Sequence, residues 1–315
     1  MKKYSLLSMV VLLFVASGLL YELYSDEHQS QSGNSHVQIE ESVEPAQEQS
    51  AEEEIVASDV KKKNSAFGFE ACLKKEGLRE EFLKIYQKLE SLGLSGTQLA
   101  GQGSYQQMPL ESLRSYAQAN DVNAMYLYGL ETMYKASLGI YMTLSYHEES
   151  DAENISERAR NHNFDKKLFN EGKRYLYQAA VQGKVIGLGE ISALHRLGAE
   201  KLSKQDVKSE VLHQFVAEGF AYTLLAKDIV RDDEFLIDEI GLKSKTFERY
   251  LKQALPGTKI EQIKSELKKA SEESYLRLKD RWDVDRTYQG LEVYPDIFTE
   301  SEEQFYTVTI ENKCG

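Results

Sequence analysis

The chain has 315 residues, of which 41% are hydrophobic and 28% are charged, so it is long enough to bury a sizeable core in one or two folded units. The four prolines and the long stretches of Ala, Leu, Glu, Lys and Tyr favour an all-α fold over a multi-stranded sheet. Ten acidic and no basic residues at 25–60 account for most of the net charge of -13, and no basic stripe indicates nucleic-acid binding.

An export signal is predicted at the amino terminus, residues 1–24. Lys2 and Lys3 precede an uncharged, mostly apolar run at 4–21, which as a helix of about 27 Å just reaches across a bilayer. This charge pattern predicts a single-pass signal anchor in a bacterial inner membrane, with the folded part in the periplasm. Cleavage near Val15-Ala16-Ser17 would give a soluble periplasmic protein instead, and a buried core helix is the remaining alternative.

Residues 25–65 are mainly Gln, Ser, Glu and Asp, with scattered apolar residues and almost no aromatics. Such a segment cannot bury enough surface to fold, so we expect an acidic disordered linker.

The only two cysteines, Cys72 and Cys314, bracket the folded part. In an oxidising compartment we expect them to form a disulfide, with two unpaired thiols as the alternative. A thiol-redox role is not expected, because the chain has no Cys-x-x-Cys pair.

Apolar spacing predicts a series of helices within a helical repeat domain at 66–285. They are expected at 73–92, 110–119, 121–146 (one long or two short), 164–181, 185–197 and 211–230, with a further helix that starts at a Thr258-Lys259-Ile260-Glu261 capping box. The polar residues at 147–163 predict a loop or an insertion. The remaining residues, 286–315, are expected to form a C-terminal tail, in which 306–310 is a short strand or an extended segment.

The segment 119–130 recurs in altered form 63 residues later, at 182–193. Each copy has a turn residue, a small residue four positions later and another small residue nine positions later. These residues are Asn120, Ala124 and Gly129 in the first copy, and Gly183, Gly187 and Ser192 in the second. Self-similarity at a fixed period is typical of stacked helical repeats, and small residues at these positions let two helices touch.

Residues 112–230 resemble the Sel1-like repeat family, which is related to the tetratricopeptide repeats. The residues that carry the resemblance are Asn120, Ala124 and Tyr128-Gly129-Leu130 in a first helix, and Tyr175, Tyr177, Ala179-Ala180 and Gly183 in a second. The second copy departs from the pattern, with Gly187 in place of the alanine and Ser192 in place of the glycine. The resemblance implies a short α-solenoid of helical hairpins; a generic helical bundle is the alternative.

No pattern in the sequence indicates catalytic chemistry, and we expect no metal or other cofactor. His147-Glu148-Glu149 lacks a second histidine at helical spacing and is interpreted as a solvated loop. His195 and His213 lie on predicted helices and are interpreted as core-edge residues rather than ligands. A peptidoglycan-acting enzyme is the main enzymatic alternative, but no Glu-Ser pair is followed by a Gly-Leu-Met-Gln segment.

The sequence therefore predicts a membrane-tethered periplasmic adaptor that binds an unknown cell-envelope protein or peptide. Four tyrosines are the candidate binding surface, because tyrosine offers a large contact area with a polar tip. They are Tyr126, Tyr134, Tyr175 and Tyr177. The alternative is that these side chains fill the core between helices. The alternative functions are a peptidoglycan-acting enzyme, an accessory of such an enzyme, or a purely structural spacer.

Overall fold

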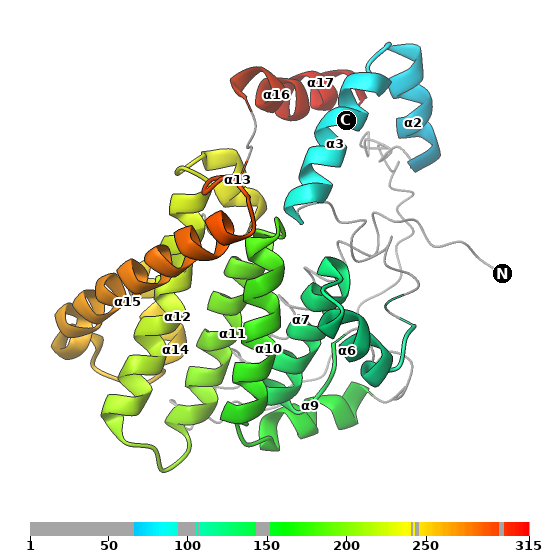
Figure 1. Cartoon of the computed structure of the whole chain (residues 1–315). Coiled ribbons are helices and arrows are strands. Elements are labelled where there is room, and N and C mark those ends of the chain that lie inside the picture. Colours follow the sequence, from blue (N-terminus) through cyan, green and yellow to red (C-terminus); the bar gives the residue numbers. More distant parts are fainter. Residues whose placement is uncertain are drawn as a thin grey trace, which may run out of the picture. The chain divides into compact units, whose positions relative to one another are not determined.

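The computed structural model describes residues 66–93, 105, 107–142, 152–240, 242, 246–295 and 299–314. All regular elements in these ranges are helical, which confirms the all-α expectation (Figure 1). Within the same ranges, no helix combines the length and the apolar composition of a bilayer-spanning segment. The predicted anchor at residues 4–21 and the predicted linker at 25–65 lie outside the described residues.

The described chain divides into two compact units. The small unit contains residues 66–79 and 309–314, and the large unit contains residues 80–308. In the small unit, α2 (Ala66–Lys75) packs on α17 (Ile310–Cys314), and a disulfide joins Cys72 to Cys314 with their Cα atoms 5.8 Å apart. The expected cysteine pairing is therefore present in the structure.

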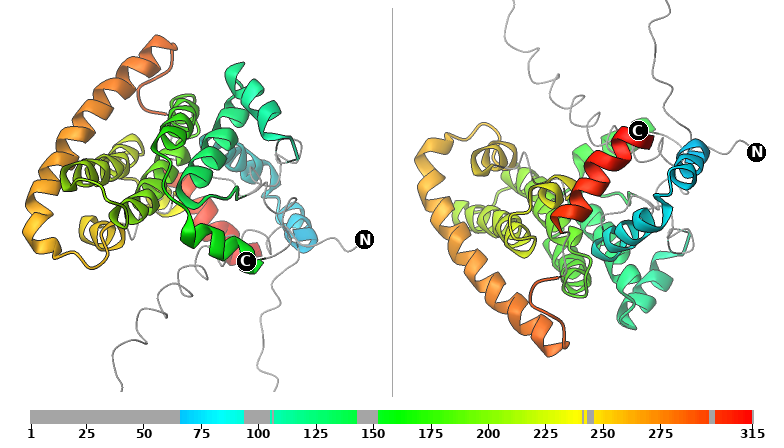
Figure 2. Two further views of the ribbon diagram at one scale, coloured as in Figure 1. Left: turned by 90° about the horizontal axis from the view of Figure 1, so that it is seen from below. Right: turned by 90° about the horizontal axis from the view of Figure 1, so that it is seen from above.

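In the large unit, helices packed on their neighbours in the chain carry most of the core. Its elements are α3 (Arg79–Leu92), α6 (Leu110–Gln118), α7 (Val122–Leu138), α9 (Ala152–Asn161), α10 (Lys166–Val181), α11 (Ile186–Ser203), α12 (Ser209–Ile229), α13 (Glu234–Glu239), α14 (Phe247–Ala254), α15 (Ile260–Tyr288) and α16 (Glu300–Gln304). The succession α6, α7, α10, α11 and α12 packs pairwise, and α11 also contacts α7 and α14. The long helix α15 runs beside α12 at one edge of this unit (Figure 2).

Left-handed residues end several helices where the sequence changes direction. Gly77, with a φ of 70°, ends α2, and the amide of Leu78 donates to the carbonyl of Leu73. This six-residue hydrogen bond is the signature of a Schellman motif. It divides the single helix expected at 73–92 into α2 and α3. Gly139, with a φ of 74°, ends α7 well before residue 146, and its own amide donates to the carbonyl of Lys135, as in the simpler left-handed cap.

Other expected boundaries also need correction. The polar segment expected at 147–163 contains the helix α9. No side chain caps α15 at Lys259, so the capping box expected at Thr258 is wrong. A complete capping box instead joins Thr299 to Glu302 at the start of α16.

The strand or extended segment expected at 306–310 is also wrong. After α15 ends at Tyr288, residues 300–314 form a helical run in which a π-helix, Phe305–Thr309, connects α16 to α17. Phe305 and Ile310 are both buried. Among the alternating apolar residues, Ile310 is buried but Val308 is 52% exposed, so the alternation does not follow one buried face.

Candidate functional site

The small residues singled out in the sequence lie where helices make their closest approaches. A Cβ atom added to Gly129 of α7 would lie 2.6 Å from the backbone nitrogen of Leu176. On the facing helix, a Cβ added to Gly172 would lie 2.7 Å from the carbonyl oxygen of Gly129. Because real Cβ atoms do not approach other atoms so closely, only glycine fits at either position. Gly129 behaves as expected, and Gly172 is its partner on α10.

The second copy of the repeated segment, at 182–193, also packs against neighbouring helices. Gly187 brings α11 close to α10, and a Cβ added to it would lie 3.1 Å from the carbonyl oxygen of Leu176. The hydroxyl of Ser192 is hydrogen bonded to that of Thr223 on α12, at 2.6 Å between buried oxygens. The remaining alanines of the pattern are fully buried, and Gly183 follows the end of α10. These alanines are Ala124, Ala179 and Ala180.

The four candidate tyrosines do not form an open surface. Tyr126 and Tyr175 are each 5% exposed and Tyr177 is 2% exposed, while Tyr134 is partly exposed. Burial raises the pKa of the phenols of Tyr126, Tyr134 and Tyr177. The expected binding surface is therefore corrected for three of the four residues, which fill the core between helices.

A polar cluster lies among α10, α11 and α12. The ammonium of Lys173 and the carboxylate of Glu218 form an ion pair, with 2.5 Å between Nζ and Oε1. Beneath them, His195 is fully buried and its Nδ1 donates to the carbonyl oxygen of Phe215 at 3.2 Å. Burial and the Lys173 charge lower the pKa of His195 to about 3.

This cluster favours a structural role over acid–base chemistry. Burial opposes the ionisation of Glu218, but the ammonium of Lys173 beside it outweighs burial, and the pKa of Glu218 lies below its usual value. A histidine with a pKa near 3 is neutral at physiological pH, and a general acid or base works best with a pKa near the working pH. His195 is thus a core residue that joins α11 to α12.

Basic side chains hold the carboxyl ends of helices that are distant in sequence. The Nζ atom of Lys201 on α11 donates to the carbonyl oxygens of Ala159 and Arg160 in the last turn of α9. In the same way, Nη1 of Arg286 on α15 donates to the carbonyl oxygen of Val181, the last residue of α10, at 2.6 Å. Such contacts satisfy carbonyl groups that a helix leaves without internal partners.

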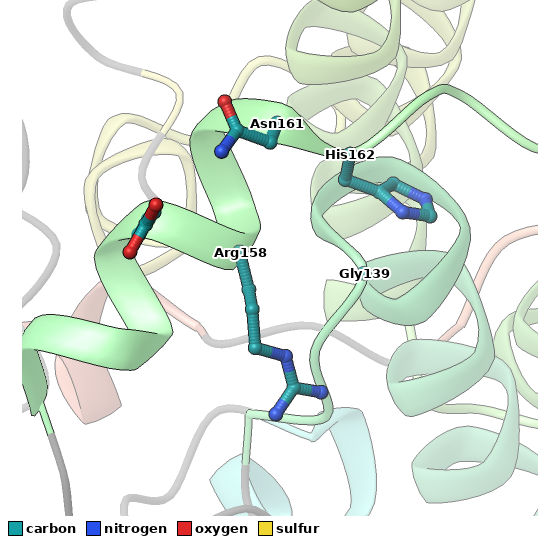
Figure 3. Close-up of a pocket in the computed structure, with 5 residues that line it drawn as sticks. Gly139, Arg158, Asn161 and His162 are labelled. Atoms are coloured by element: carbon teal, nitrogen blue, oxygen red, sulfur yellow. The ribbon is translucent and has the colours of Figure 1, made fainter.

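A cavity of about 470 Å³ lies between α9 and the end of α7. It is lined by Gly139, Glu157, Arg158, Asn161 and His162. In Figure 3, His162 lies beside Gly139, whereas Arg158 extends away from both Asn161 and His162. The labelled polar groups do not converge on a single position. Within the part of the chain that the structure describes, no group of His, Cys, Asp or Glu is arranged to hold a metal ion.

The outer face of α15 exposes large apolar side chains. Leu276 is 60% exposed, Val284 66% and Tyr288 91%, and Leu291 continues this exposure just beyond the helix. At about 100° per residue, the three helical positions fall within about 120° of one another, opposite the buried Leu267 and Trp282. We call Leu276, Val284 and Tyr288 the α15 stripe. The sequence signal for the stripe was a set of apolar residues that do not share a helix face with Leu267 and Trp282.

Comparisons with protein-family models, with curated proteins and with solved structures found no match to this chain.

Proposed function

We propose that this protein is a membrane-tethered periplasmic adaptor, whose helices form a short repeat array that binds an apolar helical segment of a cell-envelope protein. The pairwise packing of successive helices supports an α-solenoid of the Sel1-like kind. The recurrence of the same turn at Asn120 and Gly183 supports it as well. The tether and the compartment rest on the sequence at residues 4–21.

The α15 stripe is the observation that carries this proposal. Single exposed apolar residues are common on soluble proteins, but several on one face of one helix mark an interaction site. Four of the seven large apolar side chains that are exposed in the described residues lie on α15 or directly after it. A partner helix that covered this face would remove them from water.

The charges beside the stripe indicate what kind of partner fits. Acidic and basic residues on α15 pair with each other four positions apart, and the exposed Asp280 lies on the face of the stripe, between Leu276 and Val284. These pairs are Lys268 with Glu272, Lys269 with Glu273, Lys279 with Asp283, and Arg281 with Asp285. A nucleic acid or a strongly acidic peptide would find no excess of positive charge here. We therefore propose recognition by apolar contact.

Site-specific photo-crosslinking in cells tests the proposal. A photoreactive residue replaces Val284 in one variant and Lys268 in the control, because both side chains are 66% exposed on the same helix. The proposal predicts one discrete adduct from position 284. The yield of adduct from position 268 should be at least about tenfold lower, since hot-spot contacts are local. Equal yields from both positions would reject the stripe as the docking site.

Two further tests address the compartment and the enzymatic alternative. Alkaline phosphatase fused after residue 65 should be active, because the segment at 4–21 is predicted to export the chain beyond it. An inactive fusion would refute the topology. The full chain should also give no clearing zone in a zymogram that contains peptidoglycan, whereas a clearing zone would favour the cell-wall enzyme over the adaptor.

A further inference from the structure

The small unit is held together by the one covalent link between its two helices. The helix α2 has 10 residues and α17 has 5, and they are connected by a disulfide across 242 residues of sequence. Isolated helices shorter than about 12–15 residues are marginal in water. Each of these helices therefore depends on its partner, and the disulfide keeps the two together.

Regular helical hydrogen bonding is interrupted at or close to both places where the chain passes between the small and the large unit. The first crossing, between Arg79 and Glu80, lies in the first turn of α3, two residues after Gly77, whose left-handed conformation ends α2. The second crossing, between residues 308 and 309, lies inside the π-helix Phe305–Thr309. π-helical turns are rare and are frequent at functional sites. Unfolding of α2 and α17 therefore has a natural boundary near each crossing, at Gly77 and in the π-helix.

The absence of a Cys-x-x-Cys pair argues against catalysis of thiol exchange, but a structural disulfide can still be reduced. We propose that the Cys72–Cys314 disulfide is a redox-sensitive clasp, whose reduction unfolds α2 and α17 while the large unit stays folded. If the chain is tethered as proposed above, reduction also lengthens the tether. The ten residues of α2 measure about 35 Å when extended, against about 15 Å as a helix. The clasp would then control how far the large unit extends from the membrane.

The two sulfurs differ in accessibility, and this difference sets the order of the reaction. Cys72 is partly exposed, whereas Cys314 is 3% exposed. A thiolate of a dithiol reductant attacks Sγ of Cys72, the sulfur–sulfur bond breaks, and its electron pair leaves on Sγ of Cys314. The second thiolate of the reductant then attacks the mixed disulfide and releases Cys72. The reductant departs as its disulfide, and both cysteine thiolates take up protons.

Hydrogen exchange measured by mass spectrometry on the full chain tests this proposal. After treatment with dithiothreitol, amide protection should fall by at least about tenfold at 66–76 and 309–314, as expected for a locally unfolded unit. Protection in α7, α10, α11 and α12 should not change. Retained protection in α2 and α17 would overturn the proposal, and so would a loss of protection in the large unit.

A second measurement compares the reactivity of the two cysteine thiols in the reduced chain. In the reduced chain, iodoacetamide should modify Cys314 and Cys72 at rates within about threefold of each other, because thiol reactivity follows exposure once the helices unfold. If Cys314 reacts more than about tenfold more slowly, α17 has remained folded and the proposal fails. Neither measurement depends on the partner or on the membrane, so failure of the adaptor proposal would leave this test intact.

Discussion

Gln182 and Asn120 are hydrogen bonded across 62 residues of sequence, with 3.0 Å between Nε2 and Oδ1. The bond joins two turns of the same construction. Asn120 and Gly183 have φ angles of 69° and 119°, and the residue after each donates its amide to a carbonyl five positions earlier. The segment that is repeated in the sequence therefore also repeats in conformation. The helices α7 and α11 occupy equivalent positions after their turns.

The close approach of α7 to α10 predicts a large effect of Gly129→Ala. The new methyl would overlap the backbone of Leu176, and overpacking of this kind costs roughly 1–3 kcal/mol of unfolding free energy. Gly189→Ala is the milder comparison, because its Cβ would meet one atom, the carbonyl oxygen of Ile240, at a tight 3.2 Å, while alanine favours the helix by about 1 kcal/mol. Urea denaturation should show a clearly larger loss of stability for the first change; equal effects would contradict the packing.

The burial of Tyr177 predicts that its replacement affects folding. The ring lies 6.4 Å from that of Trp282, between ring centroids, and the guanidinium of Arg281 lies 4.6 Å above it. Tyr177→Ala should lower the unfolding free energy by about 3–5 kcal/mol, as expected when a buried aromatic side chain is removed. Tyr177→Phe keeps the ring and should cost less than about 1.5 kcal/mol. Thermal melts followed by circular dichroism measure both changes, and a stable alanine variant would place Tyr177 outside the core.

His195 predicts a dependence of stability on pH. Its pKa of about 3 in the folded chain lies below the ordinary value of 6.5, so the unfolded chain binds the additional proton between these values. Stability should therefore fall as the pH decreases from about 6.5 towards 3, by at most about 1.4 kcal/mol per pH unit from this residue. In His195→Asn, which retains a donor for Phe215, this contribution should be absent. Parallel pH profiles of the two proteins would contradict it.

The contact between Arg286 and Val181 predicts that Arg286 contributes to the unfolding free energy of the chain. Removing the guanidinium in Arg286→Met leaves the buried carbonyl of Val181 without this donor, and an unsatisfied buried group costs about 1–3 kcal/mol. Lys268→Met, at a side chain that is 66% exposed on the same helix, should change stability by less than about 0.5 kcal/mol. Chemical denaturation of the two variants gives the comparison, and similar losses would argue against the cap.

Helix positions could be predicted where apolar periodicity was strong. The segments expected at 110–119, 164–181 and 211–230 correspond closely to α6, α10 and α12. The sequence could not show that α7 is enclosed by α6, α10 and α11, and this enclosure is what buries Tyr126. When neighbouring helices cover both faces of a helix, the apolar pattern no longer predicts which side chains are exposed.

Other features could not be predicted from the sequence, because they depend on contacts between residues that are far apart in the chain. Lys201 and Arg286 look like ordinary surface cations, and only the fold brings them to the ends of α9 and α10. The left-handed turn at Gly77, after Lys74 and Lys75, did have a local signal, because a glycine after basic residues is typical of a helix end. Among the candidate site residues, the small residues at helix contacts followed from spacing, whereas the exposure of the α15 stripe required the helix to be placed against α12.

The most direct test of the adaptor proposal combines the crosslinker at position 284 with the double substitution Leu276→Ser and Tyr288→Ser. Both residues are exposed, so the melting temperature of the chain should not change measurably. Loss of their apolar contacts should reduce the yield of the position-284 adduct by at least about tenfold, the usual effect of removing central interface residues. An undiminished adduct in the double variant would contradict docking on the α15 stripe.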